Sequence, residues 1–292
     1  MVIIGLSGGL GNQMFQYALY CKFKNLNKEV ALDTSFFRSK QKLREIEIGI
    51  FPIKYCEISD KEADEIRGYS YYDSFFEKIK NKVKHKVYPS NFLIYEDKIE
   101  YFQPEIFDMD QVYLSGYWQN EKYFSDIANE IRTFFSFPLD MDSDNKEILS
   151  RLKQENSISV HIRRGDYLSA KNQNVYGGIC TERYYEKAFA YMNNHINKPH
   201  YFLFTDDVEW VSENIRYPNM TIVSNNKDRK SYIDMYLMSQ CKHNIIANSS
   251  FSWWGAWLNQ NEKKIVVAPK RWFNNHENAD IICEKWIKIE GK

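Results

Sequence analysis

Short apolar runs alternate with amphipathic stretches throughout the second half of the chain. The predicted strands are residues 158–162, 201–205, 220–224, 244–247 and 264–268. The predicted helices between them are residues 182–195, 208–215, 230–241 and 250–259. Strands that alternate with helices form a parallel, doubly wound sheet. Such a sheet binds ligands beyond the carboxyl ends of its strands, so the residues that follow each strand are candidates for a binding site.

The first half opens on a shorter pattern of the same kind. A strand is predicted over 2–4, a glycine-rich turn over 7–11, a helix from Asn12 and a second buried strand over 30–32. Asn12 is the predicted N-cap of that helix. Together these elements are a βαβ unit.

Further along the first half, a strand is predicted over 112–116. A helix that carries Tyr123, Ile127 and Ile131 at helical spacing is predicted to follow it. These elements extend the α/β pattern of the opening unit toward the middle of the chain.

Two other segments bear on the organisation of the chain. Lysines alternate with apolar residues from Lys78 to Lys86, which predicts either an edge strand with a basic outer face or a surface loop; a solvated face is the favoured interpretation. The polar, proline-containing stretch 137–144 is the predicted domain boundary. It divides a domain over 1–140 from a domain over 145–292.

Composition and charge exclude several classes of protein. The 39 Lys and Arg balance the 39 Asp and Glu, which argues against a general nucleic-acid binder, and 43% hydrophobic residues exclude a disordered chain. The five scattered cysteines form no CxxC pair, so neither a disulfide framework nor a zinc site is expected. Neither an apolar run of membrane-spanning length nor a secretory signal is visible. The expectation is a soluble cytoplasmic protein.

The first predicted strand of the second half leads directly into His161-Ile162-Arg163-Arg164-Gly165-Asp166-Tyr167. Two adjacent arginines at a strand end are costly to desolvate unless they meet an anion, and arginine suits a bidentate hold on phosphate. Asp166 could orient one guanidinium or act on the ligand. The alternative is an internal Arg–Asp ion pair beside a structural histidine.

The next strand ends in Thr205-Asp206-Asp207. An aspartate at this place can accept hydrogen bonds from a ribose or from the N–H donors of guanine. The alternative is that one of the pair caps the following helix, and both roles are compatible. A metal site is not favoured, because no third ligand with suitable spacing lies beside the two aspartates.

The fourth strand ends in Asn248-Ser249-Ser250-Phe251-Ser252-Trp253-Trp254-Gly255. Short hydroxyl side chains at a helix start can cap the helix while its N–H groups and dipole face an anion. For the aromatic residues of this segment, core packing and stacking on a ligand are equally open.

The N-terminal turn Gly8-Gly9-Leu10-Gly11-Asn12-Gln13 lacks both the lysine of a P-loop and the third glycine of the dinucleotide motif. It predicts a loop that allows close backbone approach, with the Asn12 and Gln13 amides exposed; the alternative is a tight structural turn. Together, the strand ends and this turn fit a sugar-nucleotide-dependent transferase best.

Four segments together resemble the bacterial α-1,2-fucosyltransferases of glycosyltransferase family 11. They are residues 8–18, from Gly-Gly-Leu-Gly-Asn-Gln to Tyr-Ala, the His161–Tyr167 segment, Phe204-Thr205-Asp206-Asp207, and residues 241–258, which include Asn-Ser-Ser-Phe-Ser-Trp-Trp-Gly. The resemblance spans nearly the whole chain. It implies a GT-B architecture, α/β with two Rossmann-like domains, the acceptor side in the N-terminal domain and the active site in the cleft between the two.

The implied reaction is transfer of L-fucose from GDP-β-L-fucose to the 2-hydroxyl of a terminal galactose, with inversion and without a required metal or other cofactor. Arg163 is implied to grip the donor diphosphate, His161 and either Asp206 or Asp207 to address guanine, and Asn12 to lie near the pyrophosphate. Arg163 and the helix start at Ser249–Ser250 would then stabilise charge on the departing phosphate.

The remaining predictions of site residues follow from these segments. Further donor-binding residues are predicted to be Gly9, Gly11, Gln13, Arg164, Asn248, Ser249, Ser250 and Phe251. The catalytic residues are predicted to be Arg163, Asn12 and, as general base, Asp166, with Glu182 as second candidate.

The expected partners are GDP-fucose and a glycan that ends in β-galactose. If that acceptor is lipid-linked, peripheral association with the inner membrane is expected. The alternatives are a GDP-sugar transferase of another linkage, such as α-1,6, or a non-catalytic glycan-binding protein that uses a surface of Trp253, Trp254 and Trp257.

Overall fold

The computed structural model describes residues 1–38, 44–67, 70, 93–96, 101–138, 140–169, 172–226, 230–274 and 280–291, apart from the side chains of Asp166 and Leu168. The chain divides into two compact units, Met1–Ser136 and Phe137–Lys292. The whole Lys78–Lys86 region lies outside the described residues, so its predicted strand or loop stays a prediction. None of the helices in the described ranges is long and apolar enough to cross a bilayer.

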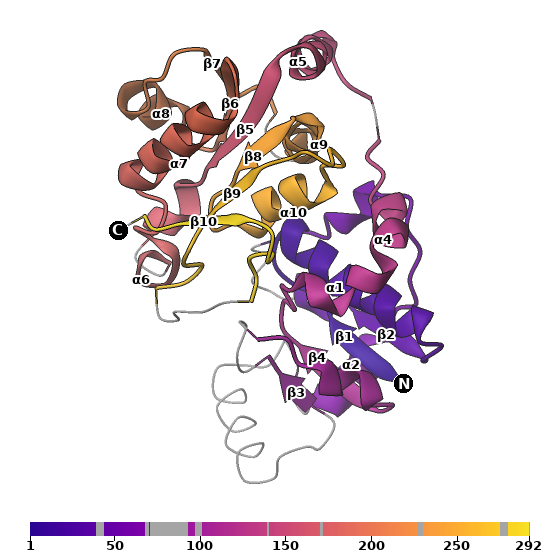
Figure 1. Ribbon diagram of the computed structural model, residues 1–292. Coiled ribbons are helices and arrows are strands. Elements are labelled where there is room, and N and C mark those ends of the chain that lie inside the picture. Colours follow the sequence, from indigo (N-terminus) through magenta and orange to yellow (C-terminus); the bar gives the residue numbers. More distant parts are fainter. Residues whose placement is uncertain are drawn as a thin grey trace. The chain divides into compact units, whose positions relative to one another are not determined.

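The first unit is built on a four-stranded sheet in which every neighbouring pair is parallel, in the order β2-β1-β4-β3 (Figure 1). Its strands are β1 (Val2–Gly5), β2 (Val30–Asp33), β3 (Leu93–Tyr95) and β4 (Val112–Ser115). Its α-helices are α1 (Leu10–Asn25), α2 (Asp60–Arg67) and α4 (Ala128–Phe134). Short 3-10 helices span Ser35–Arg38, Ile48–Ile50, Pro104–Asp108, Glu121–Tyr123 and Ser125–Ile127.

Helix α1 packs on β1 and β2, which confirms the predicted βαβ unit. The helix begins at Leu10 with Gly9 as its N-cap, so the prediction that Asn12 is the N-cap is wrong. The reason is that a distant carboxylate, Glu47, accepts the hydrogen bond of the Leu10 N–H. That long-range contact satisfies one of the free N–H groups that a local cap would otherwise take.

The predicted helix through Tyr123, Ile127 and Ile131 is interrupted. The Asn120 side chain accepts a hydrogen bond from the Lys122 N–H, and Phe124 adopts a non-helical backbone with φ −144° and ψ 12°. The segment therefore forms two 3-10 turns before α4 begins. Tyr123, Ile127 and Ile131 are nonetheless all buried, so the apolar spacing indicated burial correctly.

The second unit holds a six-stranded parallel sheet in the order β10-β9-β8-β5-β6-β7. Its strands are β5 (Asn156–Ile162), β6 (Pro199–Thr205), β7 (Met220–Val223), β8 (His243–Ile245), β9 (Val266–Pro269) and β10 (Ile287–Ile289). Its helices are α5 (Ser143–Gln154), α6 (Gln173–Tyr176), α7 (Glu182–His195), α8 (Val208–Asn214), α9 (Tyr232–Gln240) and α10 (Ser250–Leu258), and residues Gly165–Leu168 form a 3-10 turn.

Counted within the unit, this strand order is that of the doubly wound dinucleotide-binding fold, 3-2-1-4-5-6. Residues of β6 alternate between two cores, because successive side chains of a strand point to opposite faces. Tyr201 and Leu203 join the core that contains α7, whereas Phe202 and Phe204 join the core that contains α9 (Figure 1). The predicted fold class, two α/β units with parallel sheets as in GT-B enzymes, is confirmed.

The tryptophans of α10 belong to the core. Trp253 and Trp254 are fully buried and Trp257 is 5% exposed, and the Trp253 Nε1–H donates to the Ile281 carbonyl at 2.7 Å. The surface that the glycan-binding alternative needs is therefore not present. The cause is that α10 is apolar on nearly all sides and packs closely on α9, where Gly255 lies against Met238.

Candidate active site

The crossover of the second sheet lies between β5 and β8, the neighbouring strands whose chain connections run to opposite sides. Ligands of doubly wound sheets bind at this point, beyond the carboxyl ends of the strands. Residues 163–167 follow β5 and residues 246–250 follow β8, while Asp206 and Asp207 follow the adjacent strand β6. The topology therefore gathers the three predicted donor-binding segments of the second half at one edge.

Two arginine–aspartate pairs connect the ends of β5 and β6. Arg163 Nη1 lies 2.8 Å from Asp206 Oδ2, and Arg164 Nε lies 3.0 Å from Asp207 Oδ2. The Arg164 backbone N–H also donates to Asp206 Oδ1 at 3.0 Å. The internal ion pairs considered as an alternative are thus present. All four side chains are still 26–31% exposed, so a ligand can reach them.

Aromatic rings and a helix start fix the positions of these charged groups. The Arg164 guanidinium lies 3.8 Å from the centroid of the Trp210 ring, a stacking cation–π contact. Asp207 is the N-cap of α8, since its Oδ1 accepts the Trp210 N–H at 3.1 Å, so the prediction that one aspartate caps this helix is confirmed. Arg163 lies 5.9 Å from the Tyr167 ring.

Among the described side chains at this edge, His161 has a buried atom without a hydrogen-bond partner. Its side chain is 6% exposed and its ring lies 5.8 Å from that of Phe251, yet its Nδ1 has no hydrogen-bond partner within the described ranges. Burial, and then the charge of Arg163, hold the pKa of His161 well below its ordinary value, so the ring is neutral at pH 7. A buried polar atom without a partner costs about 1–3 kcal/mol, which a ligand group could recover.

The loop after β8 is held by Asn248. This residue is 2% exposed; its amide donates to the carbonyls of Tyr176 and Trp272, and its Oδ1 accepts from Cys180 Sγ. Its carbonyl accepts from the Tyr167 hydroxyl at 2.8 Å. Asn248 therefore ties neighbouring loops together, and its predicted contact with the donor stays a prediction.

The start of α10 follows this loop directly. Ser249 is the N-cap residue but makes no side-chain cap hydrogen bond, whereas Ser250 and Phe251 are partly exposed. The Ser249 hydroxyl therefore does not cap the helix. The positive end of the helix dipole at this point suits an anion.

The structure does not place either predicted general base, Asp166 or Glu182, against a substrate site. The side chain of Asp166 lies outside the part of the chain that the structure describes. Glu182 is an exposed residue in the first turn of α7. No described contact fixes either carboxylate toward a substrate, so both assignments stay predictions.

In the first unit, the glycine-rich turn follows β1. Gly8 has φ +78°, where a side chain would be strained and would meet Asn12 and Tyr117. Gly9 precedes α1, Gly11 lies buried within it, and Asn12 Oδ1 accepts from Gln119 Nε2 at 2.7 Å.

The expectation that the Gln13 amide is exposed is wrong. Gln13 is fully buried; its amide donates to the carbonyls of Gly8 and Glu45, and its oxygen accepts from the backbone of Glu47 and Ile48. The side chain joins the glycine-rich turn to the segment at residues 45–48, a long-range contact that the local sequence pattern does not reveal.

A group that sequence reasoning missed lies near this turn. Glu96 follows β3, and its Oε2 accepts from the backbone N–H groups of Tyr117 and Trp118 at 2.7 and 3.0 Å. Burial raises the pKa of Glu96 to about 7. The sequence around Glu96 has no clear hydrophobic pattern, so it does not predict that this carboxylate is buried and hydrogen-bonded to a distant loop.

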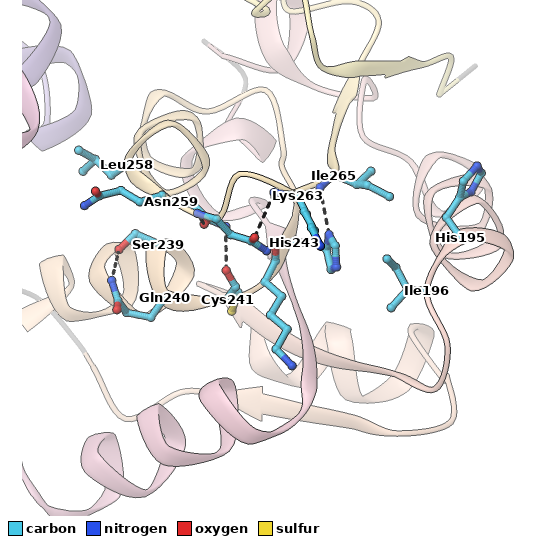
Figure 2. Close-up of a pocket in the computed structure, with 13 residues that line it drawn as sticks. His195, Ile196, Ser239, Gln240, Cys241, His243, Leu258, Asn259, Lys263 and Ile265 are labelled. Atoms are coloured by element: carbon cyan, nitrogen blue, oxygen red, sulfur yellow. Dashed lines mark hydrogen bonds between the residues drawn. The ribbon is translucent and has the colours of Figure 1, made fainter. Parts of the chain in front are cut away.

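A cavity of about 780 Å³ lies elsewhere in the second unit (Figure 2). It is lined by residues at the ends of α7, α9 and α10 and at the amino ends of β8 and β9, including His195, Cys241, His243 and Asn259. None of the predicted donor-binding residues lines it. We place the candidate site at the carboxyl edge, because the charged groups and the crossover both lie there.

Within the described ranges, no group of three or more His, Cys, Asp or Glu side chains is placed to hold a metal ion. The expectation of a metal-independent reaction stays a prediction.

An all-parallel sheet of this strand order places the second unit in the class of doubly wound α/β domains, which bind their ligands at the crossover, where the charged and polar groups lie. Residues 70–290 match the model of Glycosyl transferase family 11. The chain is 35% identical over 299 residues to an α-1,2-colitosyltransferase of Escherichia coli, with 99% of each chain covered. It therefore belongs to glycosyltransferase family 11 and is a glycosyltransferase.

Further similarities extend this comparison. The chain is 33% identical to the O-antigen biosynthesis glycosyltransferase WbnK of Escherichia coli, with 97% of this chain and 99% of that one covered. A galactoside α-(1,2)-fucosyltransferase 1 of Saimiri boliviensis boliviensis is 25% identical over 154 residues, 50% of this chain and 42% of that one. Among solved structures, FUT1 of Arabidopsis thaliana with GDP gives a TM-score of 0.45 at 12% identity, covering 93% of this chain and 71% of that one.

Proposed function

We propose that this enzyme transfers L-fucose from GDP-β-L-fucose to the 2-hydroxyl of a terminal β-galactose, with inversion and without a metal ion. The observation that carries the proposal is that Arg163, Arg164 and His161 meet at the crossover of the second sheet, where His161 Nδ1 has no hydrogen-bond partner among the described residues. The names of the related α-1,2-transferases support the linkage.

The groups at this edge suit different parts of a nucleotide diphosphate sugar. A neutral imidazole hydrogen-bonds a neutral polar group, so His161 fits the nucleobase better than the diphosphate. The guanidinium groups fit the diphosphate, because arginine presents a planar set of N–H donors to phosphate oxygens. Asp206 and Asp207, which orient the two arginines, remain alternatives for a contact to guanine.

In the proposed reaction, the acceptor 2-oxygen forms a bond to C1 of the sugar on the face opposite the leaving group. The bond between C1 and the β-phosphate oxygen breaks, and its electron pair stays on that oxygen as GDP leaves. Arg163 and the positive end of α10 would stabilise the charge as it develops, which is the role that a metal ion has in other transferases. The acceptor proton passes to a general base.

Colitose is a second donor sugar that the comparison favours, because the 35% identical relative is named as a colitosyltransferase. Colitose is fucose without its 3-hydroxyl group, so the two donors share the nucleotide and the leaving group. A site that hydrogen-bonds the 3-hydroxyl would reject the deoxy sugar strongly, whereas a site without that contact would accept both.

The name of the second relative also supports a biological setting. Since that protein is named as an O-antigen biosynthesis glycosyltransferase, we propose that this chain builds a bacterial surface glycan in the cytoplasm. A lipid-linked acceptor would bring it to the inner face of the membrane.

The test is an incubation of the purified protein with GDP-fucose or GDP-colitose, EDTA and a panel of β-galactosides, with GDP release and product linkage as readouts. An α-1,2-fucosylated product in EDTA would support the donor, the linkage and the absence of a metal requirement together. An α-1,6 product would overturn the linkage, and turnover of the colitose donor alone would overturn the choice of fucose. Glycan affinity that does not depend on GDP, without donor turnover, would overturn the enzyme assignment.

A further inference from the structure

The first sheet has a crossover of its own, between β1 and β4. In the order β2-β1-β4-β3, the chain leaves β1 toward β2 on one side, whereas β4 and β3 lie on the other. The glycine-rich turn follows β1, and residues 116–119 follow β4, so these two loops lie beyond the carboxyl ends of the strands, where doubly wound sheets bind ligands. They are in contact, because Gln119 Nε2 donates to Asn12 Oδ1 at 2.7 Å.

Glu96 lies at the same edge and holds the loop after β4. Its carboxylate accepts from the backbone N–H groups of Tyr117 and Trp118, and Gly116 leaves room for it, since a Cβ at that glycine would overlap the Glu96 side chain. Hydrogen bonds from Trp118, Tyr117 and Gln119 stabilise the charged form. A carboxylate has about four lone-pair sites, so one remains for a ligand hydroxyl.

The loop that Glu96 holds has a strained backbone and a buried polar atom without a hydrogen-bond partner among the described residues. Trp118 is fully buried with φ +55°, a backbone conformation that costs on the order of 1–3 kcal/mol for a residue with a side chain. Asn120 is 3% exposed, and its Nδ2 has no hydrogen-bond partner in the part of the chain that the structure describes. Strain and unpaired polar atoms of this kind gather at functional sites.

The chemistry of Glu96 suits proton transfer near neutral pH. Its side chain keeps a partly exposed surface, and desolvation raises its pKa to about 7, against the opposing effect of the backbone N–H groups. The titratable group that faces it is the Tyr117 phenol, which Arg44 faces in turn. A general base is most effective when its pKa lies near the working pH.

We propose that Glu96 is the general base of the transfer and that the acceptor sugar binds beyond the carboxyl ends of β1 and β4. The inference rests on the proposed function and identifies the residue that acts as its general base. The proton of the acceptor 2-hydroxyl moves to a Glu96 oxygen while the 2-oxygen bonds to C1 and the C1–phosphate bond breaks. The proton then leaves to solvent, which returns Glu96 to its charged form. Asp166 and Glu182 have no part in this step.

The experiment compares four variants of the full chain with the wild type. Glu96→Gln keeps the shape and the hydrogen-bond acceptor but removes the base, and Glu96→Asp keeps a carboxylate one methylene shorter. Asp166→Asn tests the earlier candidate. Glu62→Gln is the matched control, because it removes an exposed carboxylate of α2 in the same unit. The readouts are kcat, the pH profile of kcat/KM for a β-galactoside acceptor, GDP affinity and thermal unfolding.

For Glu96→Gln we expect kcat to fall by about 10²–10⁴, the usual contribution of a general base, with GDP affinity unchanged. In the wild type, kcat/KM should fall as the pH drops below about 7, since the base becomes protonated. That acid limb should vanish in Glu96→Gln and persist in Glu96→Asp. Glu62→Gln should keep both the rate and the limb, and in Asp166→Asn the acid limb should persist at whatever rate that variant shows.

A Glu96→Gln enzyme with wild-type kcat would overturn the inference, as would a slow variant whose acid limb persists, since that result means a purely structural role. If Glu96→Gln unfolds, Glu96→Asp decides, because a carboxylate withdrawn by one methylene should lower kcat while GDP affinity stays unchanged, and a wild-type kcat in that variant would overturn the inference. If the wild type transfers neither fucose nor colitose, the proposed function fails and this inference fails with it. That outcome is distinct, because it appears before any variant is made.

Discussion

Replacing Asp234 with asparagine tests the electrostatics of the second unit independently of catalysis. Asp234 lies in the first turn of α9, where its Oδ1 accepts from Asn226 Nδ2 at 2.7 Å. Asn226 also donates to the fully buried Asn145 at 2.9 Å. Burial raises the pKa of Asp234 from 3.8 to about 7, although the hydrogen bond from Asn226 favours the charged form. A protonated aspartate and an asparagine have the same shape and both can donate one hydrogen bond there.

The sign of the effect follows from the raised pKa. Between pH 3.8 and about 7 the folded protein keeps a proton that the unfolded chain has released, so the free energy of unfolding falls as the pH rises through this window. Each pH unit corresponds to about 1.4 kcal/mol. The two units between pH 5 and 7 therefore cost the wild type up to about 3 kcal/mol, whereas Asp234→Asn has no proton to lose. Partial exposure of the side chain lowers this to roughly 1–3 kcal/mol.

The assay is urea unfolding of the wild type and Asp234→Asn at pH 5 and pH 8. We expect the variant to gain about 1–3 kcal/mol relative to the wild type between the two conditions. Asp144→Asn, which changes an exposed aspartate of α5, should show no such gain. Parallel pH dependence of wild type and Asp234→Asn would refute the assigned environment.

Three further substitutions test the fold and the site. Gly165→Ala should destabilise the fold by about 1–3 kcal/mol and weaken GDP binding measured by calorimetry, because its methyl group would overlap the Asp206 carboxylate; unchanged affinity would contradict this. Arg67→Met should lower the free energy of unfolding in urea by about 3–5 kcal/mol, since it leaves the buried Asp33 carboxylate without the guanidinium 2.6 Å away, and among the described groups only the Tyr113 hydroxyl and the Ser35 N–H still donate to it. Arg163→Lys should reduce kcat by about 10²–10³ in a steady-state assay at saturating donor, because lysine lacks the planar set of donors; a wild-type rate would remove Arg163 from the chemistry.

The second unit is predictable in large part from its sequence. Its central strands are buried on both faces, so Tyr201–Phe204 appears as a continuous apolar run, whereas Ser159 and His161 alternate with apolar residues in Ile158–Ile162. The helix at Ser143–Gln154 is not among the predicted elements, although Ile148 and Leu152 have helical spacing. The three-residue strands β3 and β10 are too short to show a period.

The site is predictable only where chemistry is local in sequence. Adjacent arginines at a strand end indicate an anion-binding site, and this prediction does not depend on the rest of the fold. The setting of Glu96 depends instead on backbone groups 21 and 22 residues away and on the missing side chain of Gly116. The burial of Trp253 and Gln13 likewise depends on distant segments, and both residue types occur in cores and in binding sites.

The strand order of the second unit also has a consequence for its synthesis. Ile158 of β5 pairs with Tyr201 of β6 on one side and with His243 of β8 on the other. As the chain emerges from the ribosome, β5, β6 and β7 can associate well before β8 exists, which leaves the backbone N–H and C=O groups on one edge of β5 unpaired. Parallel pairing across so long a stretch is slow to form, and open edges invite aggregation. Expression of the chain truncated before residue 243 should therefore give insoluble protein, and slower translation through residues 206–242 should lower the yield of folded enzyme.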